Sequence, residues 1–202
     1  DRRIADNIAS LREHKWEKKE FGKARGLFGR TLAVLGAGKI GQEVIRRAQV
    51  FGMNTRVWSR SFTPNQAKQL GVEYCSTPLQ ACTNADALTI HLASTPDTHH
   101  IVNESLLNAL NEGAYVINTS RGELVDSHAL IKACQNRQIR AGLDVFENEP
   151  AASAQEFTHT IADEKNIYGT HHIGASTDQA SQAVADEVIR IITNYINSGF
   201  VD

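Results

Sequence analysis

Short apolar runs alternate with longer amphipathic stretches along most of the chain. Glycine or polar residues flank these runs, as is typical of the fully buried strands of a parallel sheet. We expect strands at 31–35, 54–58, 72–74, 87–92, 114–118, 139–146 and 166–170. The stretches between them predict helices, the clearest at 39–51, 65–70 and 127–136. Strand–helix alternation of this kind predicts an α/β fold, a doubly wound parallel sheet with helices on both faces in three layers.

The chain is expected to end in a long helix after the last strand. Ser176 and Gln179 have the spacing of a capping box, which predicts that the helix begins there. Its apolar face would be formed by Val184, Val188, Ile191, Ile192 and Tyr195. Residues 1–30 differ in character, being basic, aromatic and poor in helix signals after Lys19. We therefore expect a lead-in helix and linker at 1–30 and a nucleotide-binding Rossmann domain at 31–202.

The segment "VLGAGKIGQ" carries the glycine pattern of a dinucleotide-binding loop. Gly36, Gly38 and Gly41 follow a predicted strand and open a predicted helix, which is the context that this motif requires. The first glycine permits a tight turn, the second lets the backbone approach a pyrophosphate, and the third lets the helix pack on the strand. We include Lys39 and Ile40 in the expected NAD(P) site. The alternative is that the glycines form only a tight turn.

The end of the second strand bears on the choice between NAD and NADP. An acidic residue about 20 residues after the glycine loop commonly binds the ribose hydroxyl of NAD. Here Ser59 and Arg60 stand at that place. Serine removes a charge that would repel a 2′-phosphate, and arginine can pair with one, so the pair favours NADP. Alternatively, Arg60 stacks on adenine in an NAD enzyme or is a solvated loop residue.

Three polar residues follow later strands, at the edge where open parallel sheets bind ligands. They are Arg121 in "NTSRGELVD", Glu149 in "GLDVFENEP" and His172 in "THHIG". The neighbouring His171 points to the opposite side if the chain is extended. Each of the three could instead be structural or a surface residue, and Glu147 is a rival to Glu149.

Five ordered motifs give the chain a family resemblance. "GRTLAVLGAGKIGQ", "HLASTPDTHHIV", "NTSRGELVD", "GLDVFENEP" and "THHIGASTDQA" together resemble the D-isomer-specific 2-hydroxyacid dehydrogenases, most closely the D-3-phosphoglycerate dehydrogenase branch. The resemblance implies that Arg121 binds the substrate carboxylate and polarises the reacting oxygen. It implies that His172 exchanges the hydroxyl proton while hydride moves to or from the nicotinamide, and that Glu149 orients His172.

The same resemblance implies further residues of the site. Asp144 would hold the nicotinamide carboxamide, and Thr119 and Leu92 would line the cofactor. His99 and His100 stand where the family often has arginine and glycine, and we interpret them as loop residues rather than metal ligands. His91, at the end of a strand, is expected to be a buried histidine with a hydrogen-bond partner. No metal is expected.

Composition narrows the functional classes. The formal charge of −2 shows no basic surplus for nucleic acid or an acidic membrane. The apolar runs fall short of the roughly 18 residues that a membrane span needs, and the polar first residues do not resemble a signal peptide. Three scattered cysteines, at positions 75, 82 and 134, predict neither a disulfide framework nor a zinc site. They favour, weakly, a reducing cytoplasmic compartment.

The resemblance also bears on what lies outside this chain. Enzymes of the family have two domains, and we expect the substrate-binding domain to be missing here, so that the isolated chain has little or no activity. The family implies a small-molecule 2-hydroxy or 2-keto acid as the substrate, and a homodimer. Two alternatives stay open. One is an NADPH-dependent glyoxylate or hydroxypyruvate reductase, and the other is a non-catalytic NAD(H)-sensing binding protein similar to the family's corepressors.

Overall fold

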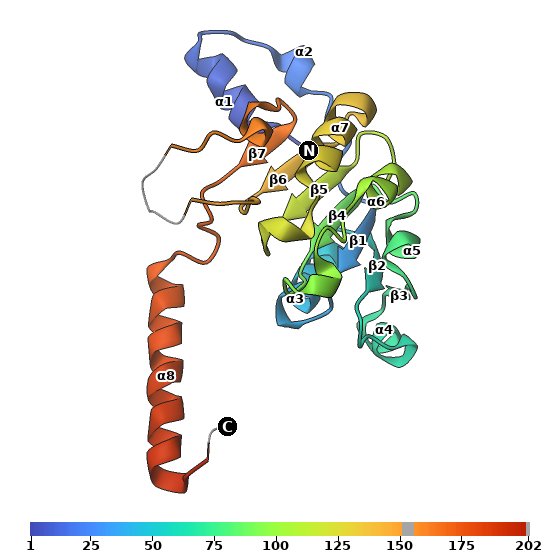
Figure 1. Ribbon diagram of the computed structural model, residues 1–202. Coiled ribbons are helices and arrows are strands. Elements are labelled where there is room, and N and C mark those ends of the chain that lie inside the picture. The colour runs from blue at the N-terminus through green and yellow to red at the C-terminus, as the bar shows by residue number, and fades with distance from the viewer. Residues whose placement is uncertain (151–155, 201–202) are drawn as a thin grey trace. The chain divides into compact units, whose positions relative to one another are not determined.

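The protein forms two compact units, residues 1–169 and residues 170–202. The structure, a computed structural model, describes residues 1–150 and 156–200 (Figure 1). The first unit contains all the strands, and the second contains the long helix α8 (Asp178–Ser198). Each unit is described by itself below.

The first unit is built on a seven-stranded sheet in which every pair of neighbours is parallel. The strands are β1 (Thr31–Leu35), β2 (Asn54–Trp58), β3 (Glu73–Tyr74), β4 (Ala87–Ile90), β5 (Tyr115–Asn118), β6 (Arg140–Leu143) and β7 (Ile167–Gly169). Their order is β3-β2-β1-β4-β5-β6-β7. All seven expected strands are confirmed, and several are shorter than predicted. The order reverses between β1 and β4, which is where ligands bind in open sheets of this kind.

Helices cover both faces of the sheet. The unit contains α1 (Ile4–Arg12), α2 (Lys18–Phe21), α3 (Lys39–Val50), α4 (Pro64–Leu70), α5 (Pro78–Cys82), α6 (Glu104–Ala109) and α7 (Ser127–Arg137). Three 3-10 turns are η1 (Pro96–Thr98), η2 (Gly122–Leu124) and η3 (Thr160–Asp163). The sequence analysis did not anticipate α5 and α6. Both are too short to show an apolar period, although Thr77 and Asn103 cap them through their side chains.

Alternate residues of β1 enter two separate cores. Leu32 and Val34 pack with α3 and α4, which contribute Ile45, Ala48 and Ala67. The opposite face of the same strand carries Ala33 and Leu35, and there α5, α6 and α7 pack on it. Successive side chains of a strand point to opposite faces, so one apolar run supplies both cores. This arrangement confirms the three-layer α/β fold.

Helix α8 begins one residue later than the sequence suggested. Its N-cap is Thr177, whose hydroxyl accepts a hydrogen bond of 3.1 Å from the amide of Ala180. The expectation that Ser176 and Gln179 start the helix was therefore wrong. Serine and threonine are both common N-cap residues, and spacing alone did not separate two neighbouring hydroxyl residues. The expected apolar side chains do lie on this helix, and none of its residues 178–198 is buried.

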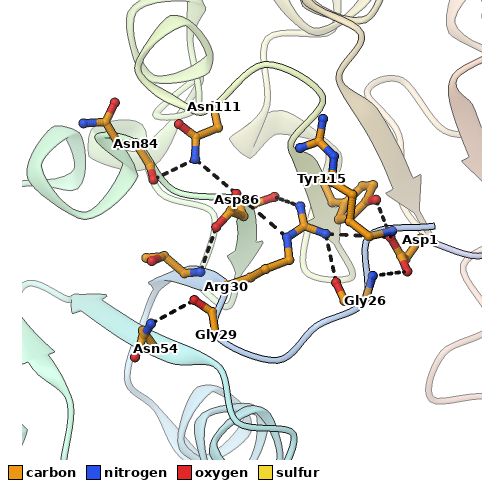
Figure 2. Close-up of polar contacts among 11 residues, drawn as sticks. Asp1, Gly26, Gly29, Arg30, Asn54, Asn84, Asp86, Asn111 and Tyr115 are labelled. Atoms are coloured by element: carbon orange, nitrogen blue, oxygen red, sulfur yellow. Dashed lines mark hydrogen bonds and ion pairs between the residues drawn. The ribbon is translucent and has the colours of Figure 1, made fainter. Parts of the chain in front are cut away.

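A polar network joins the first residues of the chain to the amino ends of the central strands (Figure 2). The carboxylate of Asp86 accepts hydrogen bonds from the Thr31 amide at 2.9 Å and from Asn111 at 3.1 Å. Arg30, whose side chain is 10% exposed, lies 3.8 Å from Asp86 and 3.7 Å from Asp1. Its guanidinium also stacks over the Tyr115 ring. The amino ends of the central strands are thus held by partly buried charges, and the carboxyl ends are left for a site.

Candidate cofactor site and active site

Strand register brings the candidate residues to one edge of the sheet. Leu35 pairs with both Trp58 and Ile90, and Asn118 pairs with both Ile90 and Leu143. The strands therefore end at nearly the same level. The residues that follow these ends form one row: Gly36, Ser59, His91, Thr119 and Asp144.

The turn after β1 is packed so tightly that two of its glycines have no room for a side chain. Gly36 has a φ of +104°, and a Cβ built there would lie 2.2 Å from the carbonyl oxygen of His91. A Cβ on Gly41 would lie 2.0 Å from the carbonyl oxygen of Gly36. Leu92 flanks the same turn, with its Cδ2 atom 3.2 Å from that Gly36 position. These contacts bring β1, α3 and the end of β4 together, as a dinucleotide fold requires.

Gly38 differs from its two neighbours in the motif. It is exposed, it is the N-cap of the 12-residue helix α3, and a Cβ there would meet no atom within 4 Å. Open space therefore lies directly in front of a helix N-terminus, where unpaired amides and the helix dipole favour a phosphate. Lys39 and Ile40 are also exposed at this end. The turn fits a dinucleotide.

The end of β2 adjoins the same turn. The amide of Gly36 donates a 2.8 Å hydrogen bond to the carbonyl oxygen of Trp58, the residue before Ser59. Ser59 is half-buried and Arg60 is exposed. The guanidinium of Arg60 lies 3.8 Å from the carboxylate of Asp97, which is 83% exposed. An ion pair that is so exposed to solvent and has such a long distance stabilises the position of Arg60 only weakly. The guanidinium is therefore able to bind another anion.

A buried asparagine shapes the loop that carries Arg121. The amide nitrogen of Asn118 donates to the Arg121 carbonyl oxygen at 2.8 Å, and its oxygen accepts from the Ser120 amide at 3.0 Å. The Ser120 hydroxyl donates to the carbonyl oxygen of Ile90 at 2.7 Å. Thr119 and Arg121 are exposed on this loop. Asn118 was not among the residues predicted from the sequence. The feature that could have identified it is a polar residue at the end of an apolar strand.

The loop after β6 packs directly against the Arg121 loop. A Cβ on Gly122 would lie 2.0 Å from the carbonyl carbon of Phe146, so the two backbones touch there. Glu149 accepts a 2.7 Å hydrogen bond from the Phe146 amide through its Oε1 atom. Asn148, just before it, has a left-handed φ of 54°. The structure thus brings the segments of Arg121 and Glu149 together, with Asp144 buried at the start of the second loop.

The rival carboxylate, Glu147, has different partners. Its Oε2 atom accepts from the Ser127 amide at 3.1 Å, at the start of α7, and its Oε1 atom lies 2.5 Å from Nε2 of His100. Burial opposes ionisation of Glu147, but the hydrogen bonds from Ser127 and His100 outweigh it and lower its pKa. Glu147 is therefore anchored to α7, whereas Glu149 is held within its own loop by the Phe146 amide.

His172 lies in the second unit and is exposed, as is His171. Its φ of 53° is left-handed, a conformation that few residues other than glycine and asparagine adopt. The spatial relation of His172 to Arg121 and Glu149 stays a prediction.

His91 is half-buried, and its Nε2 atom lies 3.0 Å from the Thr89 hydroxyl. Burial lowers the pKa of His91. The expected hydrogen-bond partner is confirmed, whereas His91 is partly rather than fully buried.

Fold and site together define a dinucleotide-binding α/β domain, and comparison with known proteins identifies its family. Residues 1–174 match the family model of the D-isomer specific 2-hydroxyacid dehydrogenase NAD binding domain. The chain belongs to this family and comprises its NAD-binding domain. The expectations for family and fold are confirmed.

Three relatives illustrate the similarity. A D-3-phosphoglycerate dehydrogenase of Methanocaldococcus jannaschii is 35% identical over 100% of this chain and 38% of its own length. A glyoxylate reductase of Thermococcus litoralis is 37% identical over 94% of this chain and 57% of its own length. The crystal structure of a D-lactate dehydrogenase from Aquifex aeolicus, complexed with NAD and lactic acid, superposes with a TM-score of 0.83 at 26% identity. That match covers 97% of this chain and 62% of the other.

The chain spans only part of the length of these relatives. The shares are 38% and 57% for the phosphoglycerate dehydrogenase and the glyoxylate reductase. Within residues 1–150 and 156–200, no helix is both long enough and apolar enough to cross a membrane.

Proposed function

We propose that this chain is the cofactor domain of a D-2-hydroxyacid dehydrogenase that transfers hydride between NAD(P) and a 2-hydroxy or 2-keto acid, of the 3-phosphoglycerate type. The observation that carries this proposal is the open space at Gly38, on the same sheet edge as the packed loops of Arg121 and Glu149. The substrate-binding half of the site belongs to a further domain, because the relatives are longer than this chain.

Each candidate residue has a role that its chemistry supports. Arg121, exposed on a loop fixed by Asn118, pairs with the substrate carboxylate and polarises the oxygen at the reacting carbon. His172 removes the hydroxyl proton during oxidation and returns it during reduction. Glu149 orients the imidazole of His172 and holds its tautomer. The nicotinamide, when bound, carries the hydride.

The test compares two neighbouring histidines in the protein that includes its substrate domain. We expect His172→Ala to lower kcat by roughly 10²- to 10⁴-fold, because a general acid–base is lost, while NADH affinity is unchanged. His171→Ala is the matched control, and it should keep near-normal turnover. Near-normal turnover of His172→Ala would refute the assignment.

For the cofactor we propose a preference for NADP over NAD. Ser59 puts no negative charge beside the 2′-position, and Arg60 has only an exposed, 3.8 Å contact with Asp97. Titration of Arg60→Ala with both cofactors should weaken NADP binding by about 10-fold or more and change NAD binding little, as expected for one lost charge-assisted contact. Arg46→Ala, an exposed arginine on α3, is the control. An equal effect on both cofactors would argue that Arg60 stacks on adenine instead.

A second candidate is an NADPH-dependent glyoxylate or hydroxypyruvate reductase. Ser59 and Arg60 favour it, and relatives with these names are 37% and 36% identical to the chain. Turnover of 3-phosphoglycerate, glyoxylate and hydroxypyruvate, measured with each cofactor on the protein with its substrate domain, distinguishes the two candidate enzymes.

A homodimer and a reducing intracellular compartment are part of the proposal. The latter is supported by Cys75, Cys82 and Cys134, which are buried free thiols.

A further inference from the structure

Two adjacent histidines and a glutamate from distant parts of the chain converge beside α7. They are His99 and His100, which follow η1, and Glu147, in the loop after β6. Each offers one ligand atom, and these three atoms all lie within 4.8 Å of one another. Among the residues that the structure describes, no other group of three or more histidine, cysteine or acidic side chains meets this criterion.

The backbone explains why both histidines face the same partner. Adjacent side chains of an extended chain point to opposite sides. His100 instead has a left-handed φ of 49°, which turns the chain between them. Its amide donates to the Glu123 carbonyl oxygen at 2.8 Å, which holds this conformation in place. The two imidazole rings consequently lie against each other, with centroids 4.0 Å apart and planes tilted by 31°.

The glutamate is oriented before any ligand arrives. Its Oε2 atom accepts from the Ser127 amide at 3.1 Å, which leaves Oε1 directed at Nε2 of His100, 2.5 Å away. The Glu147 side chain is 18% exposed and that of His100 is 35% exposed, while His99 is exposed. The cluster is thus partly shielded on the glutamate side and open to solvent on the histidine side. An ion can enter from solvent and find its carboxylate ligand already held.

This set of ligands matches one class of metal. Two imidazoles and a carboxylate are typical ligands of Zn²⁺, which binds such nitrogens and oxygens at about 2.0–2.2 Å and leaves a fourth position to water. Ligand atoms around a tetrahedral ion are then roughly 3.4 Å apart. Zn²⁺ binding therefore requires His100 Nε2 and Glu147 Oε1, now 2.5 Å apart, to separate slightly and the exposed His99 ring to turn toward them. The hydrogen bond from Ser127 to Glu147 supplies the outer support that metal ligands commonly have.

We propose that His99, His100 and Glu147 form a Zn²⁺ site with one open coordination position. A simple hydrogen-bonded pair needs only His100 and Glu147, and the adjoining His99 would then have no role at the cluster. The bound ion would join the segment after η1 to the loop that carries Glu149, two residues beyond Glu147. The three ligands follow the carboxyl ends of β4 and β6, on the same side of the sheet as the cofactor turn, and the site uses none of Arg121, Glu149 and His172.

The test is calorimetric titration of the 202-residue chain with ZnCl₂ after treatment with a chelator. We expect one equivalent of Zn²⁺ to bind with a Kd below about 50 µM, and His99→Ala to weaken binding at least about 10-fold. Glu147→Gln should weaken it similarly. His14→Asn removes an exposed histidine elsewhere, at a left-handed φ that asparagine tolerates, and should bind like the parent. His99 is exposed, so its replacement keeps the test valid even if Glu147→Gln fails to fold.

A second readout distinguishes this site from adventitious binding. A ligand that binds only the native state raises Tm as its concentration rises. ZnCl₂ should therefore raise the Tm of the parent and of His14→Asn, and raise the Tm of His99→Ala less at the same concentration. A Kd weaker than about 50 µM for the parent, or equal affinity of the parent and His99→Ala, would overturn the proposal.

Discussion

The glycine turn yields a sharp prediction, because its members differ in what a methyl group would meet. Gly38→Ala should abolish tight cofactor binding and leave the fold intact, whereas Gly36→Ala should damage the fold itself. At Gly38 the φ of −71° suits any residue, and the added Cβ meets no protein atom within 4 Å. At Gly36 the φ is +104°, and the Cβ would overlap the His91 carbonyl oxygen at 2.2 Å.

The magnitudes follow from these contacts. Replacing glycine by alanine at a compatible φ gains about 0.4–1 kcal/mol from the unfolded state, and a poorer N-cap costs a few tenths, so Gly38→Ala should change stability by less than about 1 kcal/mol. The methyl group would occupy the approach of the pyrophosphate and remove a charge-assisted hydrogen bond worth about 1.5–3 kcal/mol, which weakens binding roughly 10- to 150-fold. For Gly36→Ala, strain alone costs about 1–3 kcal/mol, and the overlap adds to it.

Urea unfolding and NADH fluorescence titration measure the two quantities on the same samples. Gly142→Ala, on β6, is the control, since its Cβ also meets nothing within 4 Å but lies inside a strand. It should keep both stability and cofactor affinity close to the parent values. Gly38→Ala binding NADH as tightly as the parent would refute the assignment of this turn to the pyrophosphate, and equal destabilisation by Gly38→Ala and Gly36→Ala would refute the packing argument.

Two further predictions concern buried titratable groups. Burial opposes ionisation of Asp86, but hydrogen bonds from Thr31 and Asn111 and the charge of Arg30 outweigh it and lower its pKa. Its stabilising contribution is therefore full above the unfolded pKa of about 3.9 and is lost as pH falls through the lower folded value. Asp86→Asn should be less stable than the parent at pH 7, and the difference should vanish in acid; a constant difference in urea unfolding from pH 7 to acid would contradict this. Burial raises the pKa values of Cys82 and Cys134 to about 12. A disulfide reagent at neutral pH should therefore label them only after unfolding in guanidinium, and rapid labelling of the native chain would argue against their burial.

Much of the fold could be predicted from the sequence, because a strand that is buried on both faces of the sheet is a short run of apolar residues. The runs at 31–35 and 54–58 coincide with β1 and β2. The Gly36, Gly38 and Gly41 spacing placed the cofactor turn, since steric demands at a strand–helix junction select glycine at these positions. Helices α5 and α6 escaped notice because a single turn or so shows no period, and the start of α8 was misplaced by one hydroxyl residue.

The candidate site was predicted less completely, because its supporting residues act across the chain. Asn118 ends β5 and fixes the Arg121 loop through two hydrogen bonds. Its role depends on a loop conformation that apolar periodicity does not encode. Similarly, only the register of the family motif selected Glu149 over Glu147 in the same short loop. Their different partners, Ser127 and His100 for the first and Phe146 for the second, separate them only in three dimensions.

The sequence by itself therefore determined the strands, the glycine turn and the class of cofactor, because each depends on residues close together in the chain. Tertiary structure decided which partners Glu147 and Glu149 have, which glycine faces open space, and that His99 and His100 meet Glu147. These outcomes depend on contacts between segments that only folding brings together. Residue type and spacing indicate which chemical roles a side chain can have. The packing around the side chain determines which of these roles it has in the folded protein.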